Sequence, residues 1–200
     1  MARGITFDPY KTTNMQGGFN TESTGFTQGD AQDDPAVRLQ LSAGTLNPFA
    51  TAPIWAGRGI IEIITKNNQT GAVIVPATAT SCDGFCVSNQ AFHGLITPNS
   101  QVPQFSPGSS VHYFRLGSNA RIPLPISADV ELLADGNTSN ASKKFVWDPV
   151  NYCVDVSANA TGMAIRLLMV SNVNNLAAKY DASSDSVNWV SDRSLGLFLI

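Results

Sequence analysis

The sequence predicts an all-β protein: a small antiparallel β-barrel or sandwich preceded by an extended polar arm. Apolar and polar residues alternate with period two in several short runs, which places successive side chains on opposite faces of a strand. Turn-forming pairs such as Asn47-Pro48 and Pro107-Gly108 separate these runs. Residues 1–36 lack any periodic apolar pattern, so we predict an arm over 1–36 and a single β domain over 37–200.

The alternating runs predict half-buried antiparallel strands with one polar face. They span residues 37–41, 126–132 and 150–156. A turn at Asp135-Gly136-Asn137 is expected to join the second run to a strand near 144–147 as a hairpin.

More continuous apolar runs occupy residues 60–64, 73–75 and 163–170. Such runs are typical of strands that are central in a sheet or covered on both faces. The one candidate helix spans residues 174–181 and has two turns at most.

The charge composition argues against nucleic acid and membrane as partners. Charged residues make up 14% of the chain, against about 25% in ordinary globular proteins. The net charge is −3, and the 12 basic residues form no stripe that could neutralise phosphates. No run reaches the ~20 apolar residues that span a bilayer. The N-terminus has no signal-peptide pattern, so we expect folding in a cytosol.

No constellation of residues indicates catalysis, a metal or a cofactor, and we expect none of them. The two histidines, His93 and His112, are few for a metal site. Cys82 and Cys86 have a C-x3-C spacing, which indicates zinc only weakly and equally fits small half-buried residues. With Cys153 the cysteine count is odd, which does not indicate a disulfide framework. No G-x-S-x-G nucleophile elbow is present.

Isolated large apolar residues interrupt the polar arm, and a plain linker would not need them. We predict that they dock on the surface of a partner protein, with coverage of the chain's own barrel as the alternative. These residues are Ile5, Phe7, Tyr10, Phe19 and Phe26. Residues 84–114 carry no formal charge, which favours a covered surface or, equally, two buried strands joined by polar turns.

The middle of the chain resembles a known family. Gly84-Phe85-Cys86-Val87 precedes a Pro107-Gly108 turn, the run at 117–124 and Trp147-Asp148-Pro149. This order, over roughly residues 50–170, resembles the decoration or structural cement proteins of tailed-bacteriophage capsids. The turn has Ser109 where the family often has an acidic residue.

The resemblance implies a β-tulip-like barrel that binds the outside of an icosahedral head and bridges major capsid protein subunits. It implies self-association as a dimer or trimer, no catalysis, and a location on the virion exterior after synthesis in the bacterial cytoplasm. Two alternatives remain: another virion component (tail, fibre or head-completion protein), or a carbohydrate-binding β-sandwich. The sandwich would stack sugars on Trp55, Trp147 or Trp189, although core packing is the more ordinary use of these residues.

Overall fold

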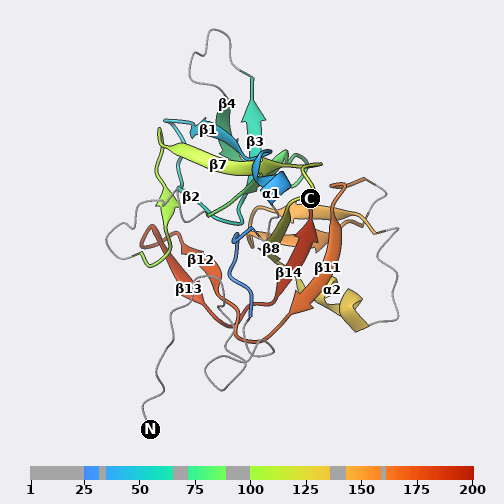
Figure 1. Ribbon diagram of the computed structural model, residues 1–200. Coiled ribbons are helices and arrows are strands. Elements are labelled where there is room, and N and C mark those ends of the chain that lie inside the picture. The colour runs from blue at the N-terminus through green and yellow to red at the C-terminus, as the bar shows by residue number, and fades with distance from the viewer. Residues whose placement is uncertain (1–24, 32–34, 65–71, 89–99, 136–142, 159–160) are drawn as a thin grey trace.

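The computed structural model describes residues 25–31, 35–64, 72–88, 100–135, 143–158 and 161–200, and it is all-β (Figure 1). Within these ranges the chain forms strands β1 to β14, two four-residue helices and one short 3-10 segment. A barrel occupies the upper part of Figure 1, and smaller sheets lie below it. No helix in the described ranges is long and apolar enough to cross a membrane.

Five strands close the barrel in the order β1-β4-β3-β5-β7. Their bounds are β1 Ser42–Leu46, β4 Ala72–Pro76, β3 Gly59–Ile63, β5 Gly84–Cys86 and β7 Ser110–Arg115. The apolar runs predicted at 60–64 and 73–75 are therefore confirmed as strands. The barrel is not wholly antiparallel. Four of its five strand pairs are antiparallel, and β1 pairs with β4 in parallel.

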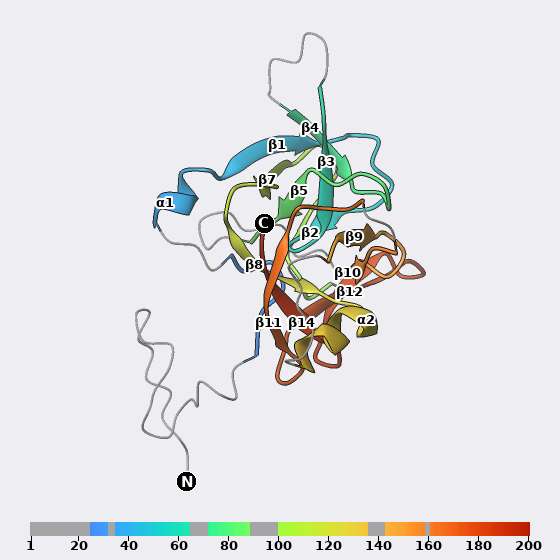
Figure 2. The same ribbon diagram turned by 90° about the vertical axis from the view of Figure 1, so that its right-hand side faces the viewer.

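Four smaller sheets complete the domain (Figure 2). A three-stranded sheet has the order β11-β14-β8, with β14 in the centre. Its strands are β11 Arg166–Ser171, β14 Leu195–Leu199 and β8 Arg121–Pro125. The others are the pairs β9 Phe145–Asp148 with β10 Cys153–Val156, β12 Ala177–Asp181 with β13 Ser186–Val190, and β2 Ile54–Trp55 with β6 Gln104–Phe105.

The main hydrophobic core lies where the barrel meets the lower sheets. Phe85 of β5 and Trp147 of β9 meet edge to face, with ring centroids 5.8 Å apart. Phe145 of β9 meets Phe198 of β14 in the same way at 5.4 Å. All four side chains are almost fully buried. A separate cluster that includes Leu46, Ile60 and Ile74 fills the barrel.

Three predicted elements differ from the structure. The run at 37–41 starts as helix α1 (Pro35–Arg38), and the strand begins at Ser42. The run at 126–132 is mostly helix α2 (Ala128–Glu131), because the Ser127 hydroxyl caps it by accepting the Val130 N–H. The candidate helix at 174–181 is instead strand β12, which pairs with β13.

The predicted hairpin between 126–132 and 144–147 is also wrong. Strand β9 pairs with β10, and the turn between them begins at Asp148-Pro149. The Asp148 carboxylate accepts the N–H groups of Val150 and Asn151, which fixes this turn. The run at 150–156 therefore becomes a strand only from Cys153.

The run at 163–170 is a strand only from Arg166, and it is not covered on both faces. Strand β11 lies at the edge of its sheet, and the register with β14 shifts between Leu167 and Met169. This bulge leaves Leu168 42% and Met169 52% exposed. A bulge on an edge strand re-aims side chains away from the ladder.

Candidate functional site

The C-terminal end of the predicted arm is held on the chain's own domain. In Figure 1 the blue segment 25–31 runs beside β8, where the Gly29 N–H donates to the Pro123 carbonyl. Leu176 exchanges two backbone bonds with this segment: it donates to the Phe26 carbonyl and accepts the Gln28 N–H. These bonds make residues 25–31 part of the domain, so a free arm can begin only upstream of Gly25.

Two buried amide side chains fix this attachment. Gln28 is 1% exposed; it donates to the Ala56 carbonyl and accepts the Ala178 N–H. Asn175 is also 1% exposed; it accepts the Phe26 N–H and donates to the carbonyls of Ser171 and Arg193. Buried polar groups satisfied in this way are costly to displace.

Gly25 brings the chain into direct contact with the turn that follows β11. A Cβ at this position would overlap the backbone of Val173 and Asn174. The chain therefore enters the domain beside the β11–β12 connection, and a side chain here would push it away.

An uncovered apolar stretch lies along the same part of the chain. Leu168 and Met169 on β11 are exposed, as are Val173 and Leu176 in the connection to β12. Exposed large apolar side chains that follow closely in the chain are candidates for protein contact. We call residues 168–176 the β11 surface.

Of the five arm residues predicted to contact a partner, only Phe26 is described. It is half-buried, and its backbone is bonded to Asn175 and Leu176 of its own domain. Ile5, Phe7, Tyr10 and Phe19 lie outside the described residues. Sequence reasoning missed the β11 surface, because a continuous apolar run also fits a buried strand.

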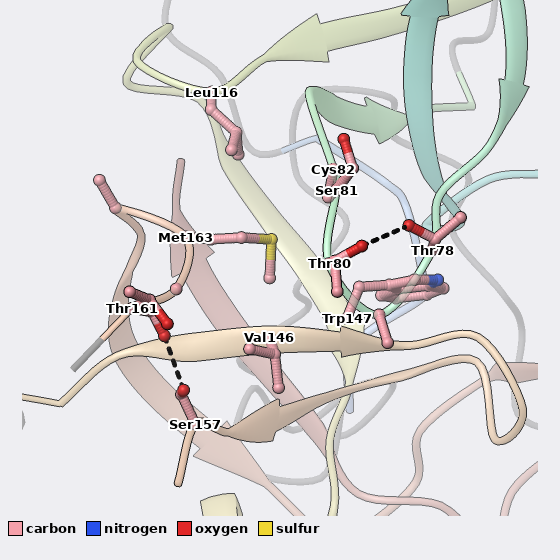
Figure 3. A pocket seen from close by; sticks show the side chains of 13 residues that line it. Thr78, Thr80, Ser81, Cys82, Leu116, Val146, Trp147, Ser157, Thr161 and Met163 are labelled. Carbon is pink, nitrogen blue, oxygen red and sulfur yellow. Dashed lines mark hydrogen bonds between the residues drawn. The ribbon is translucent and has the colours of Figure 1, made fainter. Parts of the chain in front are cut away.

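A cavity of about 420 Å³ opens between β9, the loop before β5 and the segment before β11 (Figure 3). The described residues that line it carry no charge. Part of the lining is apolar: Leu116, Val146, Trp147, Met163 and Ala164. The other part carries hydroxyls: Thr78, Thr80, Ser81, Ser157 and Thr161. In Figure 3, Met163 and Trp147 approach the cavity from opposite sides.

Backbone hydrogen bonds hold the walls of this cavity in place. The Thr78 N–H donates to the Ser81 carbonyl, which tightens the loop before β5. On the opposite wall, the Met163 N–H donates to the Phe145 carbonyl, and the Ser157 hydroxyl donates to the Thr161 carbonyl at 2.6 Å. These bonds tie both walls of the cavity to neighbouring backbone.

An aromatic cluster encloses the buried cation of Arg58. The side chain is 6% exposed, and its Cζ lies 4.6 Å from the Trp55 ring centroid and 4.8 Å from that of Tyr152. Nη1 donates to the Pro53 carbonyl. Burial lowers the pKa of the guanidinium. Aromatic faces stabilise a cation in this position by ring electrostatics.

The tryptophans proposed for sugar stacking are largely occupied inside the protein. Trp55 is 0% and Trp147 2% exposed, so neither offers a ring face to a ligand. Trp189 is half-buried in β13. Trp55 and Trp147 are therefore core residues, as the core-packing interpretation predicts.

The two spaced cysteines face different hydrophobic clusters. Cys86 belongs to the barrel interior, whereas Cys82 packs against the main core. Burial raises the pKa of Cys82 to about 12 and that of Cys86 further still. Thiols with such pKa values stay protonated at neutral pH, which makes them poor nucleophiles. Among the described residues, no group of three or more metal-ligating side chains occurs.

A polar triad on the barrel predicts a dependence of stability on pH. The Tyr113 hydroxyl and Arg115 Nε both donate to Glu62 Oε1. Burial, and then the bond to Glu62, raises the pKa of Tyr113 from 10.0 to about 12. The folded state therefore favours the protonated phenol, and this stabilisation is complete below pH 10 and lost towards pH 12.

We expect the free energy of unfolding to fall between pH 10 and 12, and to fall less steeply in Tyr113→Phe. Urea unfolding at several pH values measures the slope. Tyr180 has a pKa raised to about 12, mainly by its bond to Asp185, so Tyr180→Phe gives a comparison in the same window. Equal slopes in wild type and Tyr113→Phe would contradict the expectation.

Comparison with known proteins finds no matching family model, no matching curated protein and no matching solved structure. The resemblance to capsid decoration proteins stays a prediction.

Proposed function

We propose that this chain is a structural virion protein that binds the outer surface of a phage capsid and bridges major capsid protein subunits. The observation that carries the proposal is the β11 surface, which the domain leaves open beside the entry of the arm. Its exposed Leu168, Met169, Val173 and Leu176 are suited to an apolar protein contact.

The remaining features support a binding role over a catalytic one. The thiols of Cys82 and Cys86 are held protonated, and Trp55 and Trp147 are packed internally. The barrel and sheets form a folded base. The 24 residues upstream of Gly25 can reach roughly 80 Å from it if extended. A base with a long arm suits a protein that bridges neighbouring subunits.

The direct test uses expanded, undecorated heads assembled from the major capsid protein of the phage that encodes the chain. The full-length protein should co-sediment with them at fixed stoichiometry and raise their melting temperature, because a ligand of the assembled state stabilises it by mass action. Met169→Asp should weaken binding at least about 10-fold, because it removes a buried apolar contact and adds a charge.

Val150→Asp is the matched control. Val150 is 79% exposed but lies in the β9–β10 turn, outside the β11 surface. A second variant deletes residues 1–24 and stops there, because the hydrogen bonds of residues 25–31 belong to the domain. Absence of binding by the wild type, or equal binding by Met169→Asp and Val150→Asp, would refute the proposal.

A further inference from the structure

The cavity beside Trp147 lies apart from the β11 surface, and its lining combines hydroxyls with apolar side chains. Its described lining carries no charge, so a charged ligand would find no oppositely charged partner there. Binding such a ligand would therefore be unfavourable, because the charge would lose its hydration without compensation. The hydroxyls in its lining suit backbone or amide groups, and the apolar part of the lining suits one apolar side chain. These properties select a neutral polypeptide segment with an apolar anchor.

The chain itself contains such a segment. Residues 12–21 carry no charge and consist of Thr, Asn, Gln and Gly around two apolar residues, Met15 and Phe19. The flanking residues Lys11 and Glu22 are charged, so the neutral part is well delimited. A phenylalanine in the cavity would approach Met163, whose thioether forms favourable contacts with aromatic rings.

None of the residues that hold segment 25–31 lines the cavity, so the arm starts at a different part of the surface. Phe19 is six residues upstream of Gly25, which gives it a reach of at most about 20 Å from that point. A cavity on an adjoining copy can be placed within this reach by how the two copies dock.

We propose that the cavity is a socket for residues 12–21 of a second copy of this chain, with Phe19 as the inserted side chain. Each copy then offers an arm and a socket at separate places, which is a head-to-tail contact that can close into a ring. The contact links copies to one another and is separate from the β11 surface proposed to bind the capsid.

Sedimentation velocity of the full-length protein over a range of concentrations tests this. The wild type should self-associate reversibly. Phe19→Ala removes the anchor and Ala164→Trp fills the socket, so each should raise the dissociation constant about 10- to 100-fold. Ala164 is exposed, and so is Ala182, which lies in the turn between β12 and β13, outside the cavity lining. Ala182→Trp is therefore the matched control and should associate like wild type.

Mixing the two weakened variants gives the sharper result. Phe19→Ala keeps an intact socket, and Ala164→Trp keeps an intact arm. The mixture should therefore regain association through the arm of Ala164→Trp in the socket of Phe19→Ala. A synthetic peptide of residues 12–24 should compete with wild-type association, and its Phe19→Ala form should not.

Three outcomes would overturn the proposal: a monomeric wild type at all concentrations, association that Ala164→Trp leaves unchanged, or a mixture no stronger than its components. A monomer whose thermal stability falls in both Phe19→Ala and Ala164→Trp would show that the chain's own arm fills the socket. Since no capsid takes part, these results are independent of whether the protein binds heads.

Discussion

Replacing Trp147 with alanine is expected to lower the free energy of unfolding by about 3–5 kcal/mol, the usual cost of removing a large buried aromatic side chain. Trp147 is 2% exposed and stands in β9, but its ring meets Phe85 of the barrel strand β5. It also lies against Gly59 of β3, where a Cβ would be 3.0 Å from its ring. The side chain thus joins the barrel to the lower sheets.

Urea unfolding followed by circular dichroism measures the loss. Trp189→Ala is the matched control, because Trp189 is half-buried in β13 and should cost less. A loss below about 1 kcal/mol for Trp147→Ala would contradict the expectation. So would two separate unfolding transitions in the wild type, which would show that the barrel and the lower sheets fold independently.

Replacing Arg58 with alanine is expected to cost about 2–4 kcal/mol of stability. The change removes a buried side chain together with its contacts to the Trp55 and Tyr152 rings, and it leaves a cavity.

Arg58→Met should lower the free energy of unfolding less than Arg58→Ala. Methionine refills most of the volume and needs no desolvation of a charge.

Arg115→Ala is the control for Arg58→Ala. Arg115 also approaches a ring, at 5.9 Å from Tyr113, and pairs with Glu62, but its side chain is 57% exposed. Exposed ion pairs contribute about 0–1 kcal/mol, so this change should be mild. Thermal and urea denaturation compare the three variants. Equal stability of Arg58→Ala and Arg115→Ala would show that the aromatic enclosure contributes nothing.

The sequence predicts the class of fold because its strands are short and their ends are marked by turn residues. Asp148-Pro149 is an example, since the carboxylate bonds that make the turn come from the residue itself. The same alternation misleads at 126–132, where the Ser127 cap turns the chain into a helix while Ile126 and Val130 remain buried. Residues four apart lie on one face of a helix, and residues an even number apart lie on one face of a strand, so this spacing fits both.

The sites were harder to predict because they depend on tertiary neighbours. Residues 163–170 read as a covered strand, and only the pairing order shows that β11 is an edge. The buried pairing of Gln28 with Ala56 and Ala178 joins segments far apart in the sequence, and no local pattern signals it. Likewise, the cavity beside Trp147 brings together separate stretches of chain.

The position of β14 has a consequence for how the protein is made. Strands β8 and β11 each pair with β14 and not with each other, and β14 comprises Leu195–Leu199. While the ribosome is still adding the residues before Leu195, β8 and β11 have no common neighbour. The three-stranded sheet can therefore form only after translation has passed β14, and β8, which ends at Pro125, must wait until then. Slow codons upstream of Leu195 should prolong exposure of the unpaired strands and favour aggregation during synthesis.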